Sequence, residues 1–279
     1  MTDYYAQVAA AFDRAAAAYD REYGANPIMV WLEEDTFGRL CRLFPAGSRL
    51  LEIGCGTGAL AVRLAEAGRV VVATDISPAM IAQAMRRPTT DAARSRLTWV
   101  TVPAAGIGAH VEGPFDGAYS NFGPLNCEPD LSRFADGLAG LLRPGAAFLA
   151  SVMNRVCAWE ILWGLLRLRP RQAIRRLGRG WQMARMSAGP GESPTVLSVR
   201  FYSPGEFAAA MGPAFRVERI EGYPVIIPPP YLAGRLSRAL PWLGGVERRL
   251  RGLPGLRALG DHFLIVMRRR PTDETIERP

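Results

Sequence analysis

A glycine-rich turn between a predicted strand and a predicted helix constrains this chain more than any other feature. Leu50–Ile53 has the character of a buried strand that carries one carboxylate, Glu52, and glycines then occupy positions 54, 56 and 58. The apolar segment 59–65 predicts a helix directly afterwards. Glycine allows a positive φ or a close approach of the backbone to a ligand, and a helix N-terminus presents free N–H groups. The pattern therefore predicts a ligand-binding site where this strand ends.

A second carboxylate, Asp75, ends the next predicted strand, 70–74. In a strand–helix–strand unit, an acid at this position is placed to bind the two hydroxyls of a ribose. The first glycines also fit the dinucleotide-binding spacing, but Glu52 and Gly58 do not. A carboxylate directed into the turn repels a diphosphate and attracts a cationic ligand that carries an amino group. The two acids therefore favour a positively charged nucleoside over a dinucleotide.

The segments Glu52–Gly58 and Asp75–Met80 resemble the class I S-adenosylmethionine-dependent methyltransferases, most closely the small-molecule branch that includes the quinone-biosynthesis enzymes. The resemblance implies an α/β fold, with a Rossmann-like seven-stranded sheet, helices on both faces and an antiparallel last strand. It also implies S-adenosylmethionine as the cofactor and methyl transfer as the reaction. The residues that we assign to the cofactor are Glu52, Gly54, Cys55, Gly56, Gly58, Asp75, Ile76, Met80, Ala104, Ala105, Asn121, Phe122 and Tyr19.

The chain departs from the usual family pattern after the third predicted strand. The family generally places an acid there to hold the adenine amine, whereas this chain has Pro103, Ala104 and Ala105. The backbone groups of the two alanines are the substitute that the sequence offers. The loop after the fourth strand, 121–126, is expected to contact both cofactor and acceptor. It departs at Phe122 and Pro124 from the Asn-Pro-Pro-Tyr signature of nucleic-acid amino methylases.

We expect a lid, a core and two insertions. An apolar stripe from Val8 to Tyr19 predicts an amphipathic first helix; Tyr19 either closes over the cofactor or packs on the sheet. The predicted segments are an N-terminal helical lid (1–45), the cofactor-binding core (46–153), a hydrophobic arginine-rich cap insertion (154–195), the core continued (196–222), a second cap insertion (223–261), the last core strand (262–270) and a disordered tail (271–279).

The first cap insertion has an unusual composition. Residues 159–168 are apolar on nearly every helical face, so we expect this helix to be buried or in lipid. The segment 171–185 is expected to carry Ile174, Leu177 and Trp181 on one helical stripe beside five arginines. Both insertions follow strands at the carboxyl edge of the sheet, where ligands of open α/β sheets bind, so they should roof the acceptor. The candidate acceptor-binding residues are Tyr23, Asn126, Trp159 and Trp163.

Methyl transfer from a sulfonium is an in-line displacement that depends mainly on positioning in a water-poor site. A general base is needed only if the acceptor must lose a proton. His262 is a candidate because it opens the last strand at the site edge, beside Asp261, which could orient its ring. Asn126 is the other catalytic candidate. The four cysteines form no CxxC pair, so we expect reduced thiols and no metal site.

The composition narrows the acceptor without naming it. All 34 basic residues are arginine, and the formal net charge is +8. The apolar cap favours a small lipophilic acceptor, such as an isoprenoid, polyketide or quinone-like molecule. A membrane lipid is the alternative suggested by tryptophan and leucine beside arginine, and a nucleic acid lacks a supporting motif. A non-catalytic S-adenosylmethionine-binding regulator also stays open. We expect a cytoplasmic location, with peripheral association at the inner membrane face.

Overall fold

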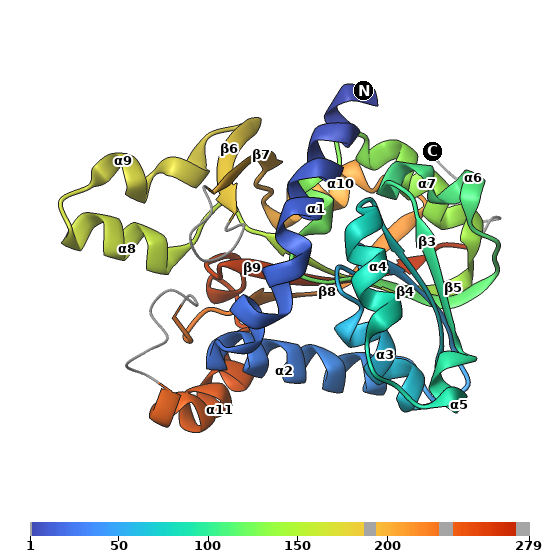
Figure 1. The fold of residues 1–279 in the computed structure, drawn as a ribbon. Helices are drawn as coiled ribbons and strands as arrows, with labels where there is room; N and C mark the ends of the chain where they lie inside the picture. Colours follow the sequence, from blue (N-terminus) through green and yellow to red (C-terminus); the bar gives the residue numbers. More distant parts are fainter. Residues whose placement is uncertain (1, 187–193, 229–236, 272–279) are drawn as a thin grey trace.

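The computed structural model describes residues 2–186, 194–228 and 237–271. Within these residues the strands form one sheet of seven, in the order β3-β2-β1-β4-β5-β9-β8, and a separate pair, β6-β7. Strand β9 is antiparallel to both of its neighbours, β5 and β8, which confirms the predicted fold class (Figure 1). The strands are β1 (Arg49–Ile53), β2 (Val70–Asp75), β3 (Leu97–Thr101), β4 (Phe115–Ser120), β5 (Leu142–Met153), β6 (Trp181–Met186), β7 (Thr195–Arg200), β8 (Phe215–Tyr223) and β9 (His262–Arg269).

The helices alternate with the strands through most of the chain, as expected for a doubly wound sheet. They are α1 (Thr2–Gly24), α2 (Pro27–Leu43), α3 (Ala59–Glu66), α4 (Pro78–Arg86), α5 (Asp91–Arg94), α6 (Ile107–His110), α7 (Leu131–Leu141), α8 (Ala158–Leu166), α9 (Pro170–Ala173), α10 (Pro204–Ala210) and α11 (Leu240–Leu250). Short 3₁₀ turns are η1 (Ala104–Gly106), η2 (Pro124–Cys127), η3 (Arg175–Leu177), η5 (Ser237–Ala239) and η6 (Leu256–Ala258).

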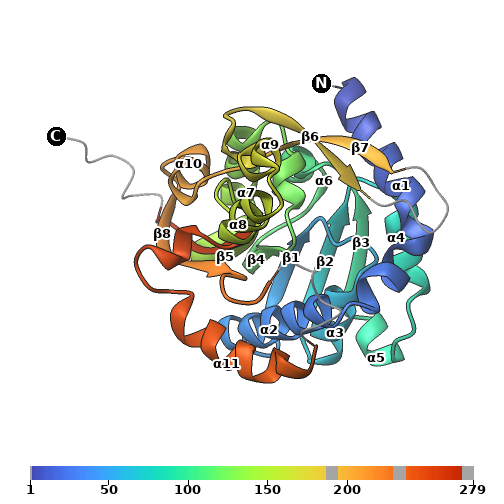
Figure 2. The ribbon, with the colours of Figure 1, turned by 90° about the vertical axis from the view of Figure 1, so that its left-hand side faces the viewer.

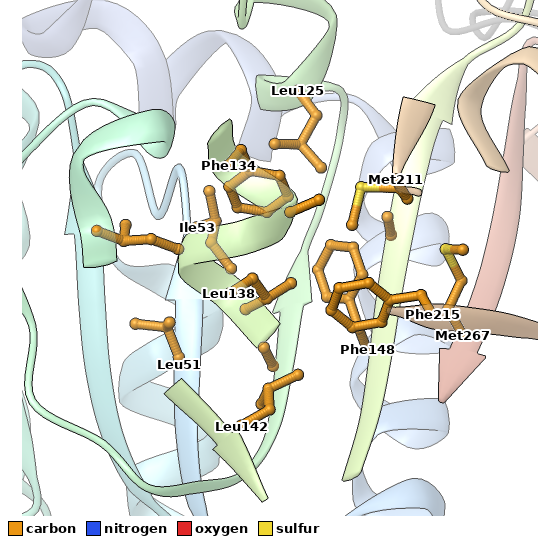
Figure 3. Close-up of a cluster of buried hydrophobic side chains, with 14 of the residues drawn as sticks. Leu51, Ile53, Leu125, Phe134, Leu138, Leu142, Phe148, Met211, Phe215 and Met267 are labelled. Carbon is orange, nitrogen blue, oxygen red and sulfur yellow. The ribbon is translucent and has the colours of Figure 1, made fainter. Parts of the chain in front are cut away.

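Alternate side chains of the central strands pack in two hydrophobic cores, one on each face of the sheet. Leu51 and Ile53 of β1 pack with Phe134 of α7 and Phe148 of β5 (Figure 3). Leu50 packs on the opposite face, against α2 and α3. Figure 2 shows α2, α3 and α11 below the sheet and α7 and α10 above it. Because successive side chains of a strand point to opposite faces, Glu52 lies on the same face as Leu50.

The first cap insertion folds differently from the single helical stripe that we predicted for 171–185. Trp181–Met186 is a strand, β6, and it pairs antiparallel with β7 in the register Trp181↔Arg200. Gly180 precedes it at φ +105°, a conformation that does not continue a right-handed helix. Trp181 therefore does not share a helical face with Ile174 and Leu177.

Helix α8 matches the predicted apolar helix in position but not in burial. Its buried residues are Glu160 and Gly164, whereas several of its leucines are exposed. The helix projects from one side of the molecule with α9 (Figure 1). Of the two predicted environments, the protein interior or lipid, the protein interior is therefore excluded. Parts of the second insertion (229–236) and of the predicted tail (272–279) lie outside the described residues. The division into core and two caps stays our proposal.

Of the described helices, none combines the length and the hydropathy needed to cross a bilayer.

Candidate cofactor and acceptor site

The glycine turn connects β1 to α3 and forms one wall of a cavity of about 510 Å³. Two of its glycines are required for different reasons. Gly58 has φ +74°, and a Cβ there would lie 2.6 Å from the ring of Trp99. Gly56 has φ +53°, but its Cβ would meet only Tyr19, at 3.9 Å. Gly58 therefore serves packing, whereas Gly56 keeps the cavity wall free of a side chain.

Glu52 lies at the bottom of this turn with only 3% of its surface exposed. Burial raises the pKa of its carboxyl from 4.5 to about 8. No hydrogen bond of standard geometry reaches its Oε2 atom among the described residues. The hydroxyl of Tyr119, aligned with Glu52 on β4, interacts with the carboxyl and lowers its pKa against the larger effect of burial. A buried carboxylate with so little hydrogen bonding is costly. Since Glu52 lines the cavity, it fits a ligand that brings a cationic amino group.

Asp75 lies at the carboxyl end of the neighbouring strand. Its Oδ2 accepts a hydrogen bond from the Gly56 N–H at 2.8 Å, and its Oδ1 accepts one from the Ser77 N–H at 2.9 Å. Burial raises the pKa of this carboxyl to about 6, against the opposing effect of these backbone donors. A carboxylate offers about four acceptor positions, so the two oxygens can also accept from ribose hydroxyls. Glu52 and Asp75 together therefore suit a nucleoside that carries a cationic amino group.

Helix α1 is fastened across this site by two aspartates. Asp13 accepts hydrogen bonds from the Ser77 hydroxyl at 2.5 Å and from the Ala79 N–H at 3.0 Å. Asp20 accepts from the Thr57 hydroxyl at 2.5 Å. Each bond joins α1 to an element that begins at the carboxyl edge of the sheet. Helix α1 therefore lies over the glycine turn, as a lid would.

The structure brings most of the predicted cofactor residues to this one cavity. Tyr23, which was predicted to contact the acceptor, also lines it, and its ring stacks on that of Tyr19 with centroids 4.3 Å apart. The predicted residues that line the cavity are Glu52, Gly54, Cys55, Gly56, Asp75, Ile76, Met80, Ala104, Asn121, Phe122, Tyr19 and Tyr23.

Two predicted backbone and amide contacts are already used within the protein. The Ala105 N–H donates to Oε2 of Glu128 at 3.0 Å, so it is not free for an adenine. The Asn126 amide group donates to the carbonyls of Met153 and Arg200, and its oxygen accepts from the Met153 N–H. Neither residue is part of the described cavity wall. Asn126 instead holds β5 and β7 together.

The two predicted cap tryptophans also lie away from the described cavity wall. The Trp159 indole N–H donates to the carbonyl of Val225 at 2.9 Å, which joins the first insertion to the second. The Trp163 ring packs under the guanidinium of Arg167, 4.4 Å from its centroid. The residues of the β6–β7 pair that do line the cavity are Ala184, Arg185, Leu197 and Val199.

His262 does not line the described cavity, but it packs against a residue that does. Its Nδ1 is 2.9 Å from Oδ2 of Asp261, so the neighbouring acid does orient the imidazole. The ring packs edge-on against Phe122, with centroids 6.3 Å apart, and Phe122 itself lines the cavity. Phe122 has φ +57°, a left-handed conformation that is rare for an aromatic residue. The Phe122 ring therefore separates the imidazole from the cavity, and the backbone of Phe122 is held in a constrained conformation.

Sequence reasoning missed a third buried acid in the cavity wall. Glu128 accepts hydrogen bonds from the Tyr5 hydroxyl at 2.6 Å, the Ala105 N–H at 3.0 Å and the Asp130 N–H at 2.9 Å. Burial raises the pKa of its carboxyl. An acid is thus placed beside the alanines that follow β3, although it comes from the loop after η2. The sequence signal was weak, because Glu128 is separated from β3 by a whole strand.

The cavity thus lies at the carboxyl ends of β1 and β2 in a seven-stranded sheet with one antiparallel strand, which is the architecture of class I methyltransferases. Residues 50–145 match the family described as "Methyltransferase domain". This domain of the chain belongs to the class I S-adenosylmethionine-dependent methyltransferases, and S-adenosylmethionine is the methyl donor of that family. The predicted family is confirmed for residues 50–145.

Individual relatives support the same assignment. The ubiquinone biosynthesis O-methyltransferase of Xanthomonas axonopodis pv. citri (strain 306) is 31% identical over 117 residues, which is 42% of this chain and 48% of that protein. The chain spans about half the length of the curated relatives it matches.

Solved structures are similar in fold. The CcbJ methyltransferase of Streptomyces caelestis has a TM-score of 0.54 and 16% identity, with 86% of this chain and 89% of that chain covered. A S-adenosylmethionine-dependent methyltransferase of Methanosarcina mazei has a TM-score of 0.53 and 17% identity, with 83% and 97% covered.

Proposed function

We propose that this protein transfers a methyl group from S-adenosylmethionine to a small lipophilic acceptor, such as an isoprenoid, polyketide or quinone-like molecule. The observation that carries the proposal is the chemical division of one cavity. Glu52 and Asp75 form an acidic end, whereas Val8, Phe12 and Leu197 contribute apolar walls. The match to ubiquinone biosynthesis O-methyltransferases is consistent with an apolar acceptor but covers only half of those proteins.

The acidic end would hold the cofactor. Glu52 would bind its amino group and Asp75 its ribose hydroxyls, while Ile76 and Met80 would contact the base. When bound, the cofactor supplies an electrophilic methyl group on a sulfonium. The bonds of Asp13 to Ser77 and Ala79 hold the lid helix α1 at the start of α4. A lid in this position would exclude water from the bound cofactor, which favours the displacement.

The apolar end would hold the acceptor between α1 and the β6–β7 pair. Val8 on α1 packs with Leu197 and Val199 on β7 in a cluster of its own. Met153, at the end of β5, packs against that cluster and lines the cavity. Apolar walls with few polar groups are typical of sites for apolar small molecules. Asn126 would act here only as a positioning residue, since its amide is bonded to the backbone.

A general base is required only if the acceptor loses a proton, and His262 is our candidate for that role. Asp261 fixes the orientation of the ring through Nδ1. The other nitrogen, Nε2, would take the proton, and a shift of the Phe122 ring would be needed for it to reach an acceptor in the cavity.

The proposal is tested by incubating the purified protein with methyl-labelled S-adenosylmethionine and fractionated extracts of the source organism. Label in a small molecule of the organic phase is the expected result, and a knockout strain should lack one species in a form heavier by a CH₂ group. The matched control is Gly56→Leu, which should transfer no label. Label in the nucleic-acid fraction, or tight cofactor binding without transfer to any fraction, would refute the proposed acceptor and favour a nucleic-acid methylase or a regulator.

The cytoplasmic location and the peripheral membrane association expected from the sequence are proposals of the same standing. If the label appears in a membrane phospholipid, the acceptor is a lipid and not a small lipophilic molecule. Fractionation of cells into cytosol and membranes tests the location directly.

A further inference from the structure

The outer surface of α8 and the chain that follows it is apolar to a degree unusual for a water-facing segment. Residues 165–171 are all exposed, and three of them are leucines: Leu165 (56%), Leu166 (69%) and Leu168 (88%). Soluble proteins rarely expose large contiguous apolar patches, and those that exist usually mark an interaction site. The exposed apolar residues of this segment, here named the cap surface, are Leu162, Leu165, Leu166, Leu168, Ile174 and Leu177.

The inner side of the same segment is charged. Glu160 is buried and receives Arg175 at 2.8 Å as well as Arg176. Arg176 also contacts Asp261 at 2.7 Å, which fixes the segment to the start of β9. A helix that faces water normally has the opposite arrangement, with apolar residues inward. The ion pairs hold the cap surface outward, so its exposure follows from the fold.

The charge of the segment identifies the chemistry of its partner. Residues 161–191 contain seven arginines and no aspartate or glutamate. Arg169, Arg171 and Arg179 are exposed and form no ion pair with a carboxylate in the described parts of the chain. Leucines interleaved with unpaired arginines match a bilayer surface, where apolar side chains enter the acyl boundary and arginines contact anionic headgroups.

The location of the segment connects it to the cavity. The chain leaves the cavity wall at Met153 and returns to it at Ala184 and Arg185. The cap surface therefore belongs to an insertion whose two ends border the apolar end of the cavity. A surface at this place would bring the cavity close to molecules dissolved in a bilayer, a consequence that rests on the proposed function.

We infer that the cap surface docks the protein on an anionic lipid bilayer, with the leucines at the headgroup–acyl boundary and the arginines on lipid phosphates. Helix α8, at nine residues, is far too short to span a bilayer, so the contact is peripheral. A second copy of the chain and a partner protein are the competing occupants.

Sedimentation of the full-length protein with vesicles tests this inference. Vesicles containing phosphatidylglycerol should bind the protein, whereas pure phosphatidylcholine vesicles should bind it weakly. Binding should fall steeply as salt is raised, because charges at a surface are screened. Removing two arginines with Arg169→Gln and Arg171→Gln should weaken binding roughly thirtyfold.

The apolar contribution needs a matched pair of variants. Leu165→Ser with Leu168→Ser should weaken vesicle binding roughly tenfold or more. Met85→Ser is the control, because Met85 is as exposed (58%) as Leu165 and belongs to α4, a helix that Figure 1 shows on the other side of the molecule from α8. This variant should bind vesicles as the wild type does.

Three results would overturn the inference: no binding to anionic vesicles at low salt, equal binding by the leucine and control variants, or a dimer in analytical ultracentrifugation that the leucine variant dissociates. Binding of S-adenosylhomocysteine is measured in parallel. If it is retained while vesicle binding fails, only the membrane contact is wrong; if it is lost in the wild type, the proposed function is wrong instead.

Discussion

Replacing Glu52 by Gln distinguishes two effects of the buried carboxylate: its destabilisation of the empty protein and its contribution to ligand affinity. In the ligand-free protein, burial raises the pKa of Glu52 from 4.5 to about 8. At pH 7 such a group is roughly nine-tenths protonated. A cationic amino group binds the ionised form, so the ligand must displace a proton. Binding at pH 7 should therefore release close to one proton, and affinity should rise between pH 7 and pH 9.

The same shift predicts the stability of the empty protein. Because the folded-state pKa lies above the unfolded value, the protonated form stabilises the fold fully below pH 4.5, and this contribution is lost as pH rises through 8. A shift from 4.5 to about 8 corresponds to at most about 5 kcal/mol. Gln resembles the protonated form at every pH. Glu52→Gln should therefore unfold at higher denaturant concentration than the wild type at pH 8.5, and at the same concentration near pH 4.5.

Ligand affinity should change in the opposite direction. A hydrogen bond to a charged partner contributes about 1.5–3 kcal/mol, so Glu52→Gln should bind S-adenosylhomocysteine roughly tenfold more weakly at pH 7. The ratio should widen toward a hundredfold above pH 8, where the wild-type carboxyl is ionised without the ligand. Isothermal titration calorimetry in buffers of different ionisation enthalpy measures both the affinity and the proton count.

Glu33→Gln is the matched control, because Glu33 also lines the cavity but is partly exposed and paired with Arg63 at 3.3 Å. It should change the affinity less than roughly threefold, as expected for an exposed pair. The reasoning is refuted if the wild type releases no proton at pH 7, or if the affinity ratio of Glu52→Gln stays constant from pH 6 to pH 9.

Three further predictions follow from individual contacts. Gly56→Leu should abolish detectable ligand binding in calorimetry and cost about 1–2 kcal/mol of stability. Gly58→Ala should lower the melting temperature more than Gly56→Leu does, because its Cβ would lie 2.6 Å from Trp99. Equal melting temperatures of the two variants would contradict this. Asp20→Asn should speed ligand dissociation roughly tenfold in stopped-flow experiments, because it weakens the hydrogen bond that joins α1 to Thr57. The urea midpoint should change little, since exposed ion pairs contribute little to stability. An unchanged dissociation rate would show that the Asp20–Thr57 bond does not retain the ligand. Glu247→Gln should cost about 1–3 kcal/mol in urea unfolding, because the Glu247 carboxylate accepts three backbone N–H groups, while ligand affinity stays within twofold.

The pattern around the glycine turn could be predicted because its requirements are local. A positive φ at Gly56 and a helix that begins at Ala59 depend on neighbouring residues. The positions of Glu52 and Asp75 follow from strand periodicity and from the parallel register of β1 and β2. Ser77 precedes Pro78 and caps α4, since its side chain accepts the Met80 N–H. Apart from the register of β1 and β2, each of these features needs only a few consecutive residues to be specified.

The acceptor side could not be predicted in the same way. Trp159 and Trp163 were assigned to the acceptor by composition, yet their polar and aromatic partners come from distant or exposed parts of the chain. Glu128 escaped notice because its partners, Tyr5 and Ala105, are far from it in sequence. The contacts of Trp159 and Glu128 exist only after the sheet has assembled, because they join residues far apart in sequence.

The sequence by itself determined the strand–turn–helix unit and the two acids of the cofactor end, because short-range backbone preferences and strand alternation encode them. Only the tertiary structure decided that 181–186 pairs as a strand with 195–200 and that α8 faces outward. The physical reason is that burial and strand pairing depend on partners far along the chain. Glu160 and Arg176 bury their charges against each other and Asp261, and that pairing leaves the leucines of α8 on the surface.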